Sequence, residues 1–278
     1  MKQRTITTVV LWVGILILLW LFGVYAGLLL ITALAVMAQH ETYGLLGRVG
    51  GDPLVVAGLV AGVLFILITS GLLLFLGSVD AYPVSLGLVF PSLVAWVMFR
   101  TPVRSLSRCL FPTLIGFLLV PACLTFFALL AMLPGLTEGQ GLFLAVWVVA
   151  VAKFSDIGAL LIGSRIGRRP LAPSYSPKKT IEGAIGGVLT SVLVACLVPA
   201  LSGDLAPAGL TFWICILLGL VLGTTAIVSD LLGSALKRIA GVKDSGKRIP
   251  GIGGGLDLVD SLLCTGPLGY AILSLALK

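Results

Sequence analysis

Residues 54–78, LVVAGLVAGVLFILITSGLLLFLGS, run for 25 positions without a charged side chain. A helix needs about 20 predominantly apolar residues to cross the hydrocarbon core of a bilayer. The segment is apolar on all sides, whereas a strand of a membrane β-barrel alternates apolar and polar residues. It is therefore predicted to be a membrane-spanning helix.

Similar apolar segments recur along the whole chain. The sequence is 59% hydrophobic and 10% charged, whereas a typical soluble domain has about 25% charged residues. These patterns predict an all-α fold, a polytopic integral membrane helical bundle. The first two segments are short and meet at Gly23, so they form either two spans, one long helix or a re-entrant pair, and the count is eight or nine. The candidate spans are roughly 7–22, 24–39, 54–78, 81–99, 110–133, 142–163, 181–201, 209–229 and 256–277.

The charged residues indicate an orientation. Nine spans with a cytoplasmic N-terminus place 16 of the 18 lysines and arginines on one side, with Lys153 inside a span and Lys278 as the exceptions. Because cytoplasmic loops are rich in lysine and arginine, we expect a protein of the bacterial inner (plasma) membrane whose polar site faces the cytoplasm. Attraction to anionic lipid headgroups then accounts for the net charge of +7 without a nucleic-acid partner.

The candidate chemistry is concentrated in the second half of the chain. Residues 1–140 hold few polar groups within the spans and are predicted to be a scaffold, whereas residues 141–278 are predicted to carry the site. The five cysteines lack metal-binding spacing, and the single His40 cannot build a histidine metal site.

The most polar segment runs from Asp230 to Asp260. Lysine and arginine bind phosphate, and glycine lets the backbone approach a ligand closely. Asp257 and Asp260 are three residues apart at the start of a predicted helix, so their carboxylates share a face and suit Mg²⁺. The segment therefore predicts a phosphate site beside a magnesium site, with the candidates Asp230, Lys237, Arg238, Lys243, Asp244, Lys247, Asp257 and Asp260.

Two further polar groups precede this segment. Ser176-Pro177 predicts a turn, Thr180 is predicted to cap the helix over 181–201, and Lys178 and Lys179 beside that N-terminus favour an anion. Earlier in the chain, Lys153 and Asp156 lie on one face of a span, close enough to pair. They are either a structural ion pair or the polar lining of a pocket.

Together these motifs resemble the signature of phosphatidate cytidylyltransferases, also called CDP-diacylglycerol synthases. The resemblance covers roughly residues 145–265, and the chain departs from the family pattern at Ile252, where the family has His, and at Leu258, where it has Arg. The matching stretches are Lys237-Arg238, Gly241-Val-Lys-Asp-Ser-Gly-Lys247, Pro250-Gly, Gly253-Gly254, Asp257 with Asp260, and Ser176-Pro-Lys-Lys-Thr-Ile-Glu-Gly-Ala-Ile-Gly-Gly187 with Asp156 upstream.

The resemblance implies that CTP and phosphatidate react to CDP-diacylglycerol and pyrophosphate. It implies that Asp257 and Asp260 bind Mg²⁺, with Asp230, Asp244 and Asp156 as further ligand candidates. It leaves open a second, monovalent cation and a homodimer. The implied phosphate and substrate contacts are Lys237, Arg238, Lys243 and Lys247 for the triphosphate, Lys178 and Lys179 for the lipid phosphate or pyrophosphate, and Ser245, Gly253 and Gly254 for substrate.

Two other functions fit part of the sequence. A CTP-dependent polyprenol or phytol kinase would use similar helices and nucleotide chemistry with a lipid alcohol as acceptor. A membrane transporter would also have many spans and charges within them, such as Lys153 and Asp156, but it should place its polar groups at mid-membrane. Because nearly all polar groups are predicted at the cytoplasmic face, an enzyme is favoured.

Overall fold

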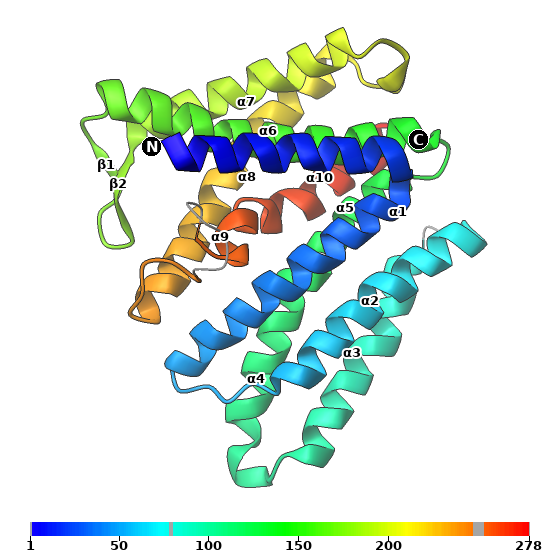
Figure 1. Cartoon of the computed structure of the whole chain (residues 1–278), viewed down its shortest axis with the longest axis vertical. Helices are drawn as coiled ribbons and strands as arrows, with labels where there is room; N and C mark the ends of the chain where they lie inside the picture. Colours follow the sequence, from blue (N-terminus) through cyan, green and yellow to red (C-terminus); the bar gives the residue numbers. More distant parts are fainter. Residues whose placement is uncertain (1, 78–79, 247–252, 278) are drawn as a thin grey trace.

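The computed structural model describes residues 2–77, 80–246 and 253–277, with the backbone alone for residues 2–12 and Leu76. This part of the chain is almost entirely helical, with one two-stranded hairpin (Figure 1). Eight of its helical segments are long and apolar enough to cross a membrane, which confirms the all-α membrane fold. The elements are α1 (Lys2–Arg48), α2 (Val55–Leu76), α3 (Ala81–Arg100), η1 (Val103–Ser105), α4 (Leu106–Phe117), η2 (Leu118–Ala122), α5 (Cys123–Ala131), α6 (Glu138–Ile166), β1 (Pro170–Ala172), β2 (Ser176–Thr180), α7 (Ile181–Leu201), η3 (Gly203–Leu205), α8 (Phe212–Ile239), α9 (Gly255–Val259) and α10 (Leu262–Ala276).

The first two predicted spans form one helix, α1, which bends at Gly23. Gly23 has a φ of 57° and a ψ of −137°, a conformation that favours glycine, and Figure 1 shows the chain changing direction between the two arms of α1. The bend frees the backbone N–H of Val24, which donates to Oε1 of Glu138 at 2.9 Å, at the start of α6. With α1 counted once, the described residues hold eight candidate spans and not nine.

Helices α6 and α7 pack closely because glycines line their contact. A Cβ on Gly183 would lie 2.8 Å from the backbone oxygen of Ala159, and one on Gly187 would lie 2.7 Å from that of Ser155. Small residues at such contacts let helix backbones approach within a membrane. Ser155 also joins α6 to α8, because its hydroxyl donates to the backbone oxygen of Gly223 at 3.1 Å. The middle of α6 is therefore fixed against both neighbours.

The main hydrophobic core lies between α5, α6, α8, α10 and the second arm of α1. It includes the buried side chains of Leu130, Trp147, Val151, Leu222 and Leu256. A second core joins α2, α3 and α4 around Phe65, Leu93 and Phe117, and Figure 1 shows α2 and α3 side by side at one end of the molecule. The candidate site described below lies against the main core.

A short β-hairpin connects α6 to α7. The sequence patterns did not predict this hairpin. Its strands are antiparallel, with Pro170 opposite Thr180 and Ala172 opposite Ser176. The predicted turn at Ser176-Pro177 is wrong in position, because the chain turns at residues 173–175 and Ser176 already begins β2. The predicted cap is confirmed: the hydroxyl oxygen of Thr180 accepts the backbone N–H of Gly183 at 3.1 Å.

We predict that Gly187→Ala lowers the stability of the protein. The added methyl group must displace the α6 backbone, and overpacking of this kind costs about 1–3 kcal/mol. Gly71→Ala in α2 is the matched control, because a Cβ there meets nothing within 4 Å. Thermal unfolding of both variants in the same detergent tests this, and equal midpoints would contradict the close α6–α7 contact.

Candidate functional site

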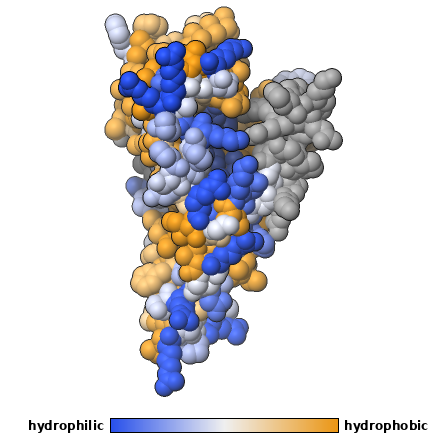
Figure 2. All heavy atoms as spheres, turned by 90° about the vertical axis from the view of Figure 1, so that its left-hand side faces the viewer, coloured by the Kyte–Doolittle hydropathy of each residue, from blue (hydrophilic) through white to orange (hydrophobic). Residues whose placement is uncertain are grey.

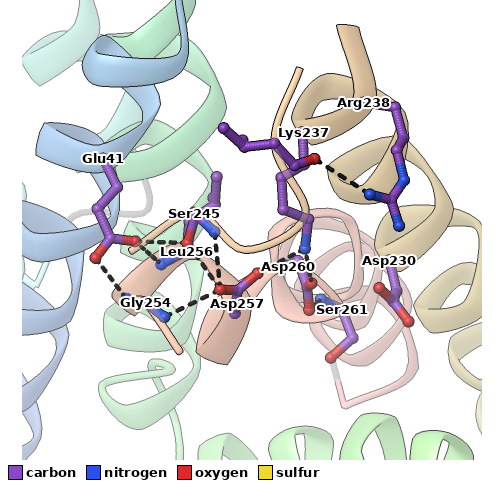
Figure 3. A network of polar contacts seen from close by, with 12 residues as sticks. Glu41, Asp230, Lys237, Arg238, Ser245, Gly254, Leu256, Asp257, Asp260 and Ser261 are labelled. Atoms are coloured by element: carbon purple, nitrogen blue, oxygen red, sulfur yellow. Dashed lines mark hydrogen bonds and ion pairs between the residues drawn. The ribbon is translucent and has the colours of Figure 1, made fainter. Parts of the chain in front are cut away.

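Lys237 lies at the centre of the polar network. Its ammonium is 2.6 Å from Oδ1 of Asp257 and 3.4 Å from Oδ2 of Asp260, and all three side chains are largely buried (Figure 3). A buried charge is tolerated when it is paired. Asp257 and Asp260 therefore share one face, as the sequence predicted, and that face is turned towards Lys237 of α8.

The second oxygen of Asp257 organises the loop that follows α8. Oδ2 accepts the backbone N–H and the hydroxyl of Ser245, both at 3.0 Å, and the backbone N–H of Gly254, also at 3.0 Å. Gly253 has a φ of 118°, and a Cβ there would lie 2.7 Å from the same oxygen. Both carboxylate oxygens of Asp257 are thus engaged, so this residue holds Ser245 and the start of α9 in place.

Glu41 of α1 completes the network, and sequence reasoning missed it. Its Oε1 accepts the backbone N–H of Gly255 at 2.9 Å, and its Oε2 accepts that of Leu256 at 3.0 Å and the hydroxyl of Ser245 at 2.7 Å (Figure 3). A Cβ on Gly254 would collide with both Glu41 and Ser245. The one signal in the sequence was a carboxylate directly after a long apolar run, with nothing local to show its partners.

The hairpin contacts α8, and Arg238 of α8 also contacts the loop that follows it. The ammonium of Lys179 pairs with Oδ2 of Asp230, and Arg238 donates to the backbone oxygens of Tyr175 at 3.2 Å and Val242 at 3.3 Å. The two basic segments that the sequence singled out therefore lie together. Lys178, Lys243 and Asp244 are solvent-exposed near them, and Lys247 and Ile252 lie outside the described residues.

Lys153 and Asp156 belong to the same region. The ammonium of Lys153 donates to the hydroxyl of Ser261 at 2.8 Å and lies 3.8 Å from Oδ2 of Asp156. The backbone N–H of Ser261 donates to Oδ1 of Asp260 at 2.8 Å. Through Ser261 the pair reaches the Lys237 network, and both of its members line a cavity, which favours the pocket interpretation of the sequence.

Two cavities border the network. The first, of about 330 Å³, is lined by apolar residues of α1, α5, α6 and α10, and by Lys153, Asp156 and Asp257 at its polar end. The second, of about 230 Å³, is more polar and includes Glu41, Arg48 and Ser245 in its lining. Because Asp257 lines the first cavity and its partner Ser245 the second, this hydrogen-bonded pair lies between an apolar and a polar space.

The predicted metal ligands are of the right chemical type. Asp156, Asp230 and Asp260 are close enough to repel one another electrostatically, and carboxylate oxygens are the protein ligands of Mg²⁺. Among the described residues, no group of three or more histidine, cysteine, aspartate or glutamate side chains is arranged so that it could hold a metal ion. The donor set fits a divalent cation, and the magnesium site stays a prediction.

Comparison with known proteins gives the family. The profile of the Cytidylyltransferase family matches residues 2–276. The chain therefore belongs to this family, whose name denotes a class of nucleotidyltransferases. Membership in an enzyme family leaves the transporter alternative without support.

The similar curated proteins include phosphatidate cytidylyltransferases. The chain is 41% identical over 139 residues to that of Synechocystis sp. (49% of this chain, 45% of the relative) and 37% identical over 134 residues to that of Chlamydia muridarum (48% and 44%). It is 39% identical over 155 residues to the uncharacterized protein YnbB of Escherichia coli (56% and 50%). The chain thus aligns with about half the length of the curated relatives it matches.

We predict that Glu41→Gln loosens the start of α9. An amide offers one acceptor oxygen where the carboxylate offers two, so a buried backbone N–H loses its partner at a cost of about 1–3 kcal/mol. Hydrogen exchange of the amides at 255–256 should accelerate about tenfold or more.

Glu182→Gln is the matched control for this experiment. Glu182 accepts the backbone N–H groups of Arg168 and Arg169 at 3.0 and 3.2 Å, away from α9. Because one oxygen, Oε2, accepts both N–H groups, the amide oxygen of Gln can keep them. The replacement removes the same charge and should leave exchange at 255–256 unchanged. Unchanged exchange at 255–256 in Glu41→Gln would show that Glu41 does not hold α9.

Proposed function

We propose that the protein is a phosphatidate cytidylyltransferase, which converts CTP and phosphatidate to CDP-diacylglycerol and pyrophosphate. The observation that carries this proposal is the apolar cavity among the spanning helices, which ends at Lys153, Asp156 and Asp257. A lipid with two acyl chains and a charged phosphate has the same division between an apolar and a charged end. Similar proteins named phosphatidate cytidylyltransferase support the same reaction.

The chemistry requires positioning and charge neutralisation more than a protein nucleophile. An oxygen of the lipid phosphate forms a bond to the α-phosphorus of CTP, and the bond from that phosphorus to the bridging oxygen of the β-phosphate breaks, releasing pyrophosphate. Holding the two reactants in line accounts for much of the barrier reduction in such reactions. No proton needs to be removed from the attacking phosphate oxygen, which is already anionic near pH 7.

The residues of the site divide into two groups under this proposal. Asp156, Asp230 and Asp260 would hold Mg²⁺, which when bound would neutralise phosphate charge. Asp257, which the family resemblance also implies as a Mg²⁺ ligand, positions Ser245 and the start of α9 through the hydrogen bonds that its Oδ2 accepts. The cations of the hairpin, of the end of α8 and of its following loop would contact the triphosphate and pyrophosphate: Lys178, Lys179, Arg238 and Lys243.

A cytoplasmic site in the bacterial inner membrane is part of the proposal. The hairpin and the end of α8, which both carry basic residues, contact each other through Arg238 and Tyr175. Figure 2 shows hydrophilic residues gathered between hydrophobic ones on the face that carries these segments. Basic segments favour the cytoplasmic side, where CTP is found.

The direct test is an assay of the purified protein with radiolabelled CTP, phosphatidate and Mg²⁺. We expect a CDP-diacylglycerol product whose formation stops when EDTA removes divalent cations. Parallel reactions with a polyprenol test the kinase alternative. A phosphorylated polyprenol together with an unreacted phosphatidate would refute the proposal.

We predict that Asp257→Asn and Asp260→Asn each lower kcat at least about a hundredfold, or about 2.7 kcal/mol of barrier. Asp257→Asn disturbs the Ser245 loop, and Asp260→Asn removes a cation-binding charge. Asp204→Asn is the control, because Asp204 is exposed in η3. Folding of each purified variant is checked by size-exclusion chromatography in detergent. Near-normal turnover of Asp260→Asn at saturating Mg²⁺ would contradict its assignment.

A further inference from the structure

Lys153 occupies a distinctive place in the apolar cavity. It lies near the middle of α6, fifteen residues after Glu138 and thirteen before Ile166. Of the described residues that line the cavity, Lys153 is the one cation, and its neighbours along the lining include Val149 and Leu262. A charge within a membrane span is expensive and is usually kept for a function.

The ammonium of Lys153 is less satisfied than those of the other lysines of the site. Lys237 is 2.6 Å from Asp257, and Lys179 is in direct contact with Asp230. The 3.8 Å between Lys153 and Asp156 is too long for a hydrogen bond. Within the described part of the chain its one side-chain hydrogen bond goes to the hydroxyl of Ser261, although an ammonium has three N–H donors.

We propose that Lys153 binds the phosphate group of the lipid substrate inside the apolar cavity. This inference rests on the proposed function and adds the residue that recognises the lipid headgroup. The acyl chains lie along the apolar lining, and the phosphate accepts the free N–H donors of Lys153 in a site of low dielectric constant, where the attraction is strong.

This assignment also gives a basis for selectivity. Asp156 and Asp257 at the same end of the cavity are carboxylates, so among the described lining side chains Lys153 is the one that attracts a phosphate directly. A neutral diacylglycerol has no charge to pair with Lys153, so its binding does not depend on that ammonium. Lys153 therefore favours lipids with a terminal phosphate over neutral lipids of the same chain length.

A binding experiment tests the inference without relying on turnover. Displacement of a fluorescent phosphatidate from the purified protein in neutral detergent gives affinities for phosphatidate and for diacylglycerol. We expect Lys153→Met to weaken phosphatidate binding at least tenfold and to leave diacylglycerol binding unchanged. Lys153→Arg, which keeps the charge, should retain most of the affinity. Lys153→Gln, which removes the charge but keeps a donor for Ser261, serves as the second variant if Lys153→Met does not fold.

Kinetics then identify which phosphate Lys153 contacts. In the charge-removing variant the KM for phosphatidate should rise at least tenfold while the KM for CTP stays the same. A rise confined to the KM for CTP would assign Lys153 to the nucleotide and overturn the inference. The inference would also be overturned if Lys179→Met lost phosphatidate binding while Lys153→Met bound phosphatidate normally.

The two levels of proposal can fail separately. If the protein binds phosphatidate through Lys153 but forms no CDP-diacylglycerol, the inference stands and the proposed reaction is wrong. If CDP-diacylglycerol forms and phosphatidate affinity does not depend on Lys153, the reaction stands and the inference is wrong.

Discussion

The pairing of one buried ammonium with two carboxylates is the interaction on which the site depends. Lys237 comes from the last turns of α8, whereas Asp257 and Asp260 come from the start of the last span. If one partner of a buried ion pair is removed, the other charge is left uncompensated, at a cost of about 3–5 kcal/mol. Lys237 therefore fixes the position of α9 and α10 relative to α8, and the remaining polar contacts are arranged around that fixed point.

The network connects segments that are far apart in the sequence. Asp257 holds Ser245, and Glu41 holds Ser245 together with the first N–H groups of α9, across more than 200 residues. The glycines at 253 and 254 follow from this crowding, because a side chain at either position would strike a carboxylate oxygen. The hydrogen-bonded residues Asp257, Ser245 and Glu41 therefore lie between an apolar cavity and a polar cavity. Under the proposed function, the lipid would come from the apolar side of these residues and the nucleotide from the polar side.

Much of this arrangement could be predicted from the sequence, because the signals are local. Apolar runs define the spans, the three-residue spacing of Asp257 and Asp260 places them on one face, and Thr180 is a standard cap. Glu41 could not be found in this way, because its partners are backbone N–H groups that only the folded chain brings near. The sequence indicates a break between two apolar segments at Gly23, but the hydrogen bond from Val24 to Glu138 that stabilises the bend depends on tertiary packing. The sequence alone does not decide between the two roles of Lys153, because the cavity around it is formed by helices that are distant in the sequence.

The most direct measurement of the central interaction is a double-mutant cycle between Lys237 and Asp257. Unfolding free energies of Lys237→Met, Asp257→Asn and the double variant, measured by chemical denaturation in one detergent, give the coupling energy of the pair. We expect a coupling of at least about 1 kcal/mol, and a smaller one in the parallel cycle with Asp260, whose oxygen is farther from Lys237. A coupling of less than about 0.3 kcal/mol between Lys237 and Asp257, no larger than that of independent sites, would contradict the claim that this contact organises the site.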